Sequence, residues 1–319
     1  MSLTITLIGA GTIGLSFAAL HLKYALRHRL HLVVHDTRPD IEEYVRENLP
    51  KYIDLDLAEL HGGSCLAKVK DQDVTHKLTF SSVMQEAVEA ADIIQEQGPE
   101  NASFKNALWP EVEKHCPPSA LLWSSTSGIP ASVQSANMRD PSRLIVVHPY
   151  NPPHVMPLLE IVPSPFTNPN VIEQTMKYWE DKERKLVLVK KETTGFVANR
   201  LAFALFREAI HLVNEGVATV KDIDDLMTSS LGPRWAVAGV FKSYHAGGGA
   251  GGLEGWFQNI GTTVQGCWDD LGQEHVGEGW QDTVFDQTKN AYGVVDTRER
   301  DEKTRSVLAA VAASSHKAL

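Results

Sequence analysis

The stretch Leu3-Thr-Ile-Thr-Leu-Ile-Gly9-Ala-Gly11-Thr-Ile-Gly14 decides how the first half of the chain folds. A short β-branched run ends directly at three glycines, and an apolar helical pattern follows. The first glycine permits a tight turn, the second lets backbone approach a phosphate, and the third lets helix pack on strand. The start of that helix offers free N–H groups and the positive end of its dipole. This order predicts a dinucleotide diphosphate site, lined by Gly9, Gly11, Thr12, Ile13 and Gly14.

Asp36 closes the second predicted strand, 22 residues after Gly14. A carboxylate there accepts hydrogen bonds from the adenosine ribose and disfavours a 2′-phosphate, which predicts NAD as the cofactor rather than NADP. Arg38 lies close by and could meet a phosphate, although a solvated side chain is the expected role. The competing interpretation is a glycine-rich turn that binds nothing beside a solvated Asp. Strand, helix and acid together favour the dinucleotide site.

Short apolar runs alternate with helical stretches through the first 190 residues. Near-continuous apolar strands separated by helices indicate a parallel sheet covered on both faces, so we expect a Rossmann-type, doubly wound α/β domain. The expected strands are Leu3–Ile8, Leu30–His35, Leu78–Phe80, Asp92–Gln95, Ala120–Ser124, Leu144–His148 and Lys185–Val189. The expected helices are Ile13–Arg27, Ile41–Leu60, Ser82–Ala90, Ala102–His115 and Asn170–Glu183.

The strand pattern stops near Thr194, and the remaining chain is predicted to be all-α. Gly195–Val217 is apolar enough to suggest burial on more than one side. Helical patterns also cover Val220–Ser229 and Ser306–Ser314, and the glycine-rich Gly247–Gly252 between them could be a lid or a linker. We expect residues 1–190 to form an NAD-binding domain and residues 191–319 a helical domain for substrate binding and dimerisation.

Composition narrows the function classes. The 319 residues carry 30 Lys+Arg against 40 Asp+Glu, a formal net charge of −10 that disfavours nucleic-acid and anionic-membrane partners. Three scattered cysteines are too few for a disulfide framework or a zinc site, so we expect no metal and a reducing compartment. The sequence shows neither a signal peptide nor a long apolar span, which predicts a cytoplasmic protein.

The segment from Leu144 to Pro163 carries a candidate catalytic pair. His148 is expected near the end of a strand, and a proline-rich turn that reverses the chain follows it. Glu160 is expected in the second extended run, after that turn. Such a pair suits alcohol oxidation, because a neutral imidazole can take the hydroxyl proton while hydride leaves the same carbon. The carboxylate would fix the tautomer and stabilise the imidazolium. Taken alone, His148 would more often be a hydrogen-bonded core histidine and Glu160 a solvated residue.

Seven motifs, in order, resemble the L-3-hydroxyacyl-CoA dehydrogenase superfamily over nearly the whole chain. They are Gly9-x-Gly11-x-x-Gly14, Asp36, Glu96 in Gln95-Glu-Gln-Gly-Pro-Glu100, Ser125-Thr-Ser127, His148-Pro-x-Asn-Pro, Glu160 and Thr194-Gly-Phe-Val-Ala-Asn199-Arg. The resemblance implies a His148–Glu160 dyad, with Ser127 and Asn199 hydrogen-bonding around the substrate oxygen and the nicotinamide. Besides the glycine turn and Asp36, the predicted cofactor-binding residues are Glu96, Lys105 and Ser127.

Two subgroups that oxidise free hydroxy acids look closer than the fatty-acid enzyme. The chain resembles L-gulonate 3-dehydrogenase and its lens relative λ-crystallin in length and in Asn-Pro-Pro after the histidine. It resembles L-carnitine dehydrogenase in Gly232-Pro-Arg-Trp-Ala236 and in Tyr244-His-x-Gly-Gly-Gly249. Arg234 is the candidate for binding a substrate carboxylate, since a guanidinium offers planar bidentate recognition. An arginine paired with an acid at a subunit interface is the alternative.

The aromatic side chains of the helical half also have two interpretations. They could line a pocket for a quaternary ammonium group, or they could belong to the core or an interface. The residues concerned are Trp235, Tyr244, Trp256 and Trp268.

The leading hypothesis is an NAD-dependent dehydrogenase that oxidises a small L-3-hydroxy acid, gulonate- or carnitine-like, to the 3-keto acid. His148 would be its general base, and the family resemblance implies a homodimer through the helical domain. A true 3-hydroxyacyl-CoA dehydrogenase would need basic residues along Ile41–Lys77 to meet the CoA phosphates, and acids are mixed with them there. A third possibility is a non-catalytic, crystallin-like NAD-binding protein, against which the intact set of site residues argues.

Overall fold

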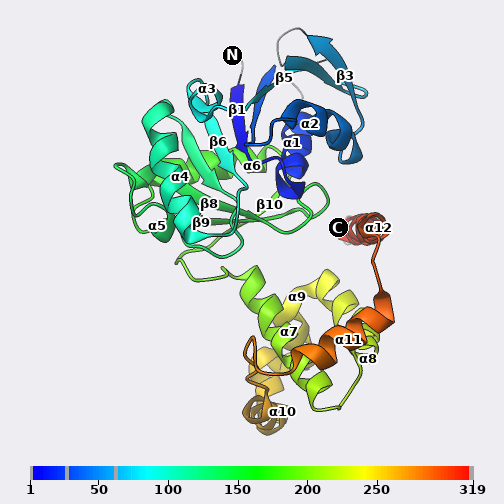
Figure 1. Ribbon diagram of the computed structural model, residues 1–319. Coiled ribbons are helices and arrows are strands. Elements are labelled where there is room, and N and C mark those ends of the chain that lie inside the picture. The colour runs from blue at the N-terminus through cyan, green and yellow to red at the C-terminus, as the bar shows by residue number, and fades with distance from the viewer. Residues whose placement is uncertain (1–2, 26–28, 61–63, 73, 316–319) are drawn as a thin grey trace. The chain divides into compact units, whose positions relative to one another are not determined.

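The computed structural model describes residues 3–25, 29–60, 64–72 and 74–315 (Figure 1). The chain divides into two compact units, Met1–Arg200 and Leu201–Leu319. The first unit is built on a ten-stranded sheet with the order β10-β9-β8-β7-β6-β1-β2-β5-β4-β3. Its strands are β1 (Leu3–Ile8), β2 (Leu30–His35), β3 (Leu55–Leu60), β4 (Ser64–Val69), β5 (Thr75–Ser81), β6 (Ile93–Glu96), β7 (Leu121–Ser124), β8 (Leu144–Pro149), β9 (Leu158–Pro163) and β10 (Lys185–Leu188).

The centre of this sheet confirms the predicted doubly wound α/β architecture. Strand β1 pairs in parallel with β2 on one side and with β6 on the other, so Ile5 lies between Leu32 and Ile93. The chain order reverses at this point, and in open α/β sheets ligands bind outside the carboxyl ends of the strands at such a reversal. Antiparallel pairs flank the parallel centre: β9 against β8, and β4 against both β5 and β3.

Helices cover both faces of the sheet, so its central strands are buried on both sides (Figure 1). Leu121 and Trp123 of β7 join one buried cluster with Trp179, whereas Leu122 joins the opposite cluster with Trp109. The helices of the first unit are α1 (Thr12–Tyr24), α2 (Ile41–Asn48), α3 (Met84–Val88), α4 (Ala102–His115), α5 (Ala131–Gln134) and α6 (Pro169–Glu180). Every residue of α1 from Gly14 to Leu22 is buried, so the cofactor turn is attached to a rigid core helix.

The predicted helix Ile41–Leu60 is wrong beyond Asn48. A single 3₁₀ turn with Pro50 follows α2, and proline opposes continuation of a helix because its ring clashes with the preceding turn. The segment Leu55–Leu60 then forms β3, which pairs with β4; neither strand was expected from the sequence. The predicted C-terminal end of the first helix, Arg27, lies outside the described residues.

The described part of the second unit contains helices and turns but no strand. Its helices are α7 (Ala198–Asn214, which begins in the first unit), α8 (Val220–Leu226), α9 (Gly232–Gly247), α10 (Gly252–Asp270), α11 (Gln281–Tyr292) and α12 (Thr297–Ser315). Ile210 and Val213 on α7 pack with Trp280 and Val284 in a small buried cluster. Among the described helices, none is long and apolar enough to cross a membrane.

The glycine-rich segment Gly247–Gly252 forms the corner between α9 and α10. A Cβ on Gly248 would lie 1.7 Å from the carbonyl oxygen of Gly252, so only glycine permits this approach. The Leu253 N–H at the start of α10 donates to His245 Nδ1 at 3.1 Å. The glycines therefore allow the end of α9 to pack directly against the start of α10.

Candidate active site

The glycine turn of the first unit forms a cradle at the start of α1. Gly9 has φ +100°, a conformation that side-chain-bearing residues rarely adopt, and a Cβ on Gly14 would lie 2.0 Å from the carbonyl oxygen of Gly9. A Cβ on Gly11 would meet nothing within 4 Å, so the backbone there faces open space. Gly11 is the N-cap of α1 and supplies no side-chain cap, which leaves first-turn N–H groups for a ligand. This cradle fits a dinucleotide diphosphate.

Asp36 lies at the end of β2, beside that cradle. Its Oδ2 accepts a hydrogen bond from the Ala10 N–H at 2.9 Å, and its Oδ1 accepts from the Arg38 N–H at 3.1 Å. The guanidinium of Arg38 stacks on the ring of Tyr44, 3.7 Å from its centroid, with its Nε 3.7 Å from Asp36 Oδ1. Arg38 is therefore held in place rather than freely solvated as expected, because α2 brings Tyr44 against it. The carboxylate remains at the position where ribose hydroxyls would bind.

His148 and Glu160 are direct partners in the antiparallel pairing of β8 with β9. His148 Nδ1 lies 2.8 Å from Glu160 Oε2, and the two side chains are only 4% and 2% exposed. Since the charged carboxylate can only accept a hydrogen bond, Nδ1 carries the ring proton and donates it in that bond, and a neutral imidazole leaves Nε2 without a proton. The ring of Phe196 packs against the imidazole at 5.2 Å between centroids, which restricts its orientation further.

The Glu160 carboxylate is held in its charged form. Burial alone would raise its pKa, but hydrogen bonds from His148 and from the Ala198 and Val197 N–H groups outweigh that, so the pKa is lowered. The two N–H groups lie 3.0 and 2.9 Å from Oε1 and belong to the segment that starts α7. One carboxylate therefore orients the histidine and fixes the backbone that leads to Asn199.

Ser127 and Asn199 meet through a hydrogen bond in which Asn199 Nδ2 donates to the Ser127 carbonyl at 2.8 Å. The loop that carries Ser127 is held by Glu100, which the sequence indicated only as the last residue of the motif Gln95-Glu-Gln-Gly-Pro-Glu100. One Glu100 oxygen accepts from the Thr126 hydroxyl at 2.6 Å and from the Ser127 and Gly128 N–H groups at 3.1 and 3.0 Å. Its position four residues after Glu96 gave no signal of this contact, which depends on the return of the chain through β7.

Glu96 and Lys105 form a buried ion pair under this loop. Their Oε1 and Nζ atoms lie 2.6 Å apart, with the side chains 0% and 1% exposed. Glu96 also accepts from the Gly98 N–H at 2.6 Å and from the Ser124 hydroxyl at 2.8 Å. Direct contact with a cofactor would require the pair to open, so in the described structure both residues support the surrounding loops.

Arg234 lies in the second unit, in the first turn of α9, and its side chain is exposed. In the same unit the rings of Tyr244 and Trp256 lie 4.8 Å apart at 55°, and Phe257 packs edge-on against Trp256 at 5.1 Å. Carboxylate binding by Arg234 and ammonium binding by the aromatic rings stay predictions. Within the described residues, no cluster of three or more His, Cys, Asp or Glu side chains could hold a metal ion.

Two family models match the chain in succession. The NAD binding domain of 3-hydroxyacyl-CoA dehydrogenase matches residues 4–193, and the C-terminal domain of the same enzyme matches residues 195–283. The chain therefore belongs to the 3-hydroxyacyl-CoA dehydrogenase family. It is an NAD-dependent oxidoreductase that acts on a CH–OH group, as the ordered motifs predicted.

Two similar proteins belong to one subgroup of this family, the L-carnitine dehydrogenases. The chain is 34% identical to L-carnitine dehydrogenase from Pseudomonas sp, over 98% of this chain and 95% of that protein. It is 32% identical to L-carnitine dehydrogenase from Streptomyces coelicolor, over 95% and 93%. The predicted similarity to the carnitine dehydrogenase subgroup is thus confirmed.

Solved structures share the fold over almost the full length. The NAD⁺-dependent 5-formyl-3-hydroxy-2-methylpyridine 4-carboxylic acid 5-dehydrogenase has a TM-score of 0.76 and 25% identity, covering 98% of this chain and 99% of that chain. The 3-hydroxyacyl-CoA dehydrogenase of Archaeoglobus fulgidus has a TM-score of 0.66 at 24% identity, covering 97% and 99%. The second likeness concerns the fold alone.

Proposed function

We propose that the protein oxidises the 3-hydroxyl group of a small L-3-hydroxy acid, with L-carnitine as the first candidate substrate. The buried His148–Glu160 pair is the observation that carries this proposal. NAD would be held by the glycine turn and Asp36 and would supply the hydride acceptor for the substrate carbon. Nε2 of His148 takes the hydroxyl proton, and Glu160 stabilises the imidazolium that results. Ser127 and Asn199 orient the substrate oxygen.

The second unit offers groups for the two charged ends of carnitine. Arg234 is proposed for the carboxylate, which a guanidinium binds in a bidentate manner. The inclined rings of Tyr244 and Trp256 are proposed for the trimethylammonium group, since aromatic faces attract cations that cannot donate hydrogen bonds. The similarity to L-carnitine dehydrogenases supports both assignments.

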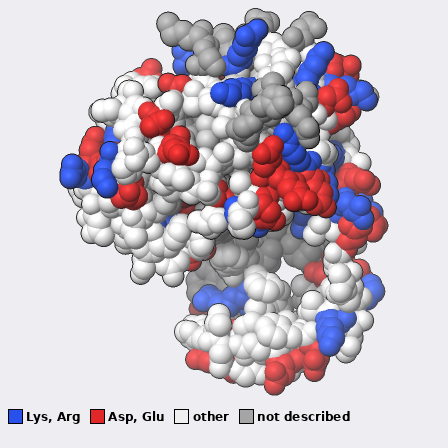
Figure 2. Space-filling model, turned by 45° about the horizontal axis from the view of Figure 1, so that its top comes forward, with Lys and Arg blue, Asp and Glu red and all other residues white. Residues whose placement is uncertain are grey.

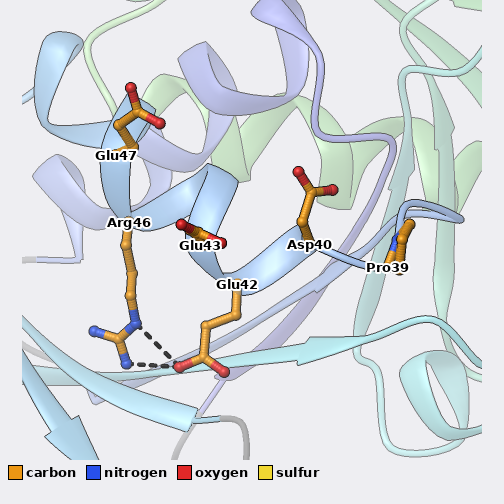
Figure 3. A pocket seen from close by; sticks show the side chains of 6 residues that line it. All are labelled: Pro39, Asp40, Glu42, Glu43, Arg46 and Glu47. Atoms are coloured by element: carbon orange, nitrogen blue, oxygen red, sulfur yellow. Dashed lines mark hydrogen bonds and ion pairs between the residues drawn. The ribbon is translucent and has the colours of Figure 1, made fainter.

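The surface around α2 argues against a CoA thioester as the substrate. Acidic side chains gather on this part of the first unit (Figure 2), and Asp40, Glu42, Glu43 and Glu47 line an open hollow of about 800 Å³ there (Figure 3). Among the described residues that line the hollow, Arg46 is the basic one, and it is paired with Glu42 at 2.8 Å. Such a surface repels the phosphates of CoA.

A substrate panel tests the proposal. NADH formation should be measured with L-carnitine, D-carnitine, L-gulonate, L-3-hydroxybutyrate and L-3-hydroxybutyryl-CoA under identical conditions. We expect the highest kcat/KM with L-carnitine and a loss of at least about 100-fold with its D enantiomer, whose hydrogen and hydroxyl exchange places at the reacting carbon. A preference for the CoA thioester would overturn the free-acid assignment. Tight NAD binding without turnover on any compound would favour a non-catalytic role.

Replacing Asp36 with Ala should narrow the preference for NAD over NADP by about 10- to 100-fold, because the variant loses two ribose hydrogen bonds and the repulsion of a 2′-phosphate. The ratio of the two kcat/KM values measures this. Asp40→Ala, which removes a nearby acid of the hollow, is the matched control and should change the ratio little. An unchanged ratio in Asp36→Ala would show that this acid is not at the ribose.

We further propose a homodimer through the helical unit. Large apolar side chains on α7 are exposed in the single chain, with Leu201 at 63%, Phe203 at 62% and Phe206 at 57%. Exposed apolar surface of this kind is typical of an interface. The wild type should sediment with the mass of two chains, and Phe203→Glu should sediment with the mass of one. Phe166→Glu, which charges an equally exposed phenylalanine of the first unit, should remain dimeric. A one-chain wild type would contradict the proposal.

We also propose a cytoplasmic location. Cys65, Cys116 and Cys267 are all free thiols, the state that a reducing compartment maintains. Cell fractionation with an antibody to the protein tests this.

A further inference from the structure

The side-chain amide of Gln97 is buried with both polar atoms unpaired. Neither Oε1 nor Nε2 has a hydrogen-bond partner in the described structure. The backbone of Gln97 is well anchored, since its N–H donates to the Ile8 carbonyl at 2.8 Å. A buried amide without partners destabilises a protein, because it has lost its bonds to water and gained nothing in return. A group of this kind gains partners if a ligand binds beside it, so its place in the fold matters.

Gln97 lies where a dinucleotide would bind. It follows β6 directly, so it stands at the carboxyl end of one of the two strands between which the chain order reverses. A Cβ on Gly14 would lie 3.6 Å from Gln97 Oε1, and a Cβ on Gly9 would lie 3.0 Å from the Gln97 carbonyl oxygen. The amide is therefore beside the first turn of α1 and the glycine cradle.

A neighbouring glutamine shows what a structural amide looks like in this sheet. Gln95, two residues earlier on β6, has both side-chain atoms paired: Oε1 with His21 Nε2 at 2.9 Å and Nε2 with Ser125 Oγ at 3.1 Å. Burial lowers the pKa of His21 to about 3, so this ring is neutral and its Nε2–H donates to the amide oxygen. Gln95 is thus fully paired within the sheet, whereas neither polar atom of Gln97 is paired.

We propose that Gln97 is a further cofactor-binding residue, whose Nε2–H donates to a diphosphate oxygen of NAD. The proposal rests on the cofactor cradle at Gly9–Gly14 and not on which hydroxy acid is oxidised. The N-terminus of α1 draws the diphosphate to the place where the amide lies. A donor there completes the set of N–H groups around the phosphates, and binding pairs a group that the free protein leaves unsatisfied.

The variant Gln97→Met tests the proposal, because it keeps the size of the side chain and removes its polar atoms. The Kd for NAD should rise about 10-fold, the loss expected for one hydrogen bond to a charged group. The Kd for ADP-ribose, which keeps the diphosphate but lacks the nicotinamide, should rise equally. The Tm of the protein without cofactor should stay the same or increase. Isothermal titration and scanning calorimetry measure these quantities without any substrate.

Gln95→Met is the matched control, since it removes a paired amide from the same strand. Its Tm should fall, because His21 and Ser125 lose their partner. A Gln97→Met protein whose Tm falls in the same way, or whose Kd for NAD stays within about twofold of the wild type, would overturn the proposal. A weakened Kd for NAD with an unchanged Kd for ADP-ribose would overturn the assignment to the diphosphate. Failure of the substrate panel leaves these binding results unaffected.

Discussion

Replacing His148 with Ala should lower kcat by about 10²- to 10⁴-fold while the Kd for NAD stays nearly unchanged. The imidazole is the proposed acceptor of the hydroxyl proton, and its Nε2 is free because the ring proton sits on Nδ1, which donates a hydrogen bond to Glu160. Cofactor binding depends instead on the glycine cradle and Asp36. Steady-state kinetics on the best substrate, together with titration of NAD, separate the two effects.

A control for this variant must show that the fold survives. His76 is a fully buried histidine on β5 that accepts a hydrogen bond from the Leu30 N–H, outside the proposed site. His76→Ala should lower the Tm without lowering kcat in the folded fraction. If His148→Ala loses NAD affinity and kcat together, the loss reflects misfolding and His148 is not the base.

Replacing Glu160 with Gln should lower kcat by about 10³-fold and also lower the Tm at neutral pH. The carboxylate accepts three hydrogen bonds, from His148 Nδ1 and from the Val197 and Ala198 N–H groups. An amide has one acceptor oxygen, so its NH₂ group must face a donor on one side. If the NH₂ group faces His148, the imidazole must take the other tautomer. If it faces Val197 and Ala198, the start of α7 loses the acceptor of its two N–H groups.

The pH dependence of stability gives this prediction a second measurement. The pKa of Glu160 is lowered below its ordinary value of 4.5, so its hydrogen bonds stabilise the fold fully above that pH. That stabilisation is lost as the pH falls through the lower folded-state pKa. The Tm difference between wild type and Glu160→Gln should therefore be largest near neutrality and should shrink below about pH 4.5.

Glu113 provides the matched control for Glu160→Gln. Its carboxylate accepts from two consecutive backbone N–H groups, those of Arg139 and Asp140, at 2.8 and 2.7 Å. Glu113→Gln should lower the Tm modestly and leave kcat unchanged. Equal kcat in Glu160→Gln and wild type would contradict the proposed role of the dyad.

Local sequence signals predicted much of the cofactor half. The strand, glycine turn and helix from Leu3 onward are contiguous, so their geometry follows from short-range rules. The pairing of His148 with Glu160 could also be predicted from the sequence, because a tight antiparallel connection determines which residues face each other. The structure of Leu55–Leu60 was harder to predict, since a short run of six mixed apolar and polar residues soon after a helix fits either a helix or a strand.

The sequence by itself determined the fold class and the cofactor, and it proposed polar residues at the carboxyl edge of the sheet. Only the tertiary structure decided how those residues are held. Glu100 binds the serine loop, Arg38 stacks on Tyr44, and Gln97 is left without a partner. Each of these states depends on segments that are distant along the chain or on neighbours set by packing. Hydrogen-bond partners follow from positions in space, and a sequence pattern specifies only neighbours along the chain.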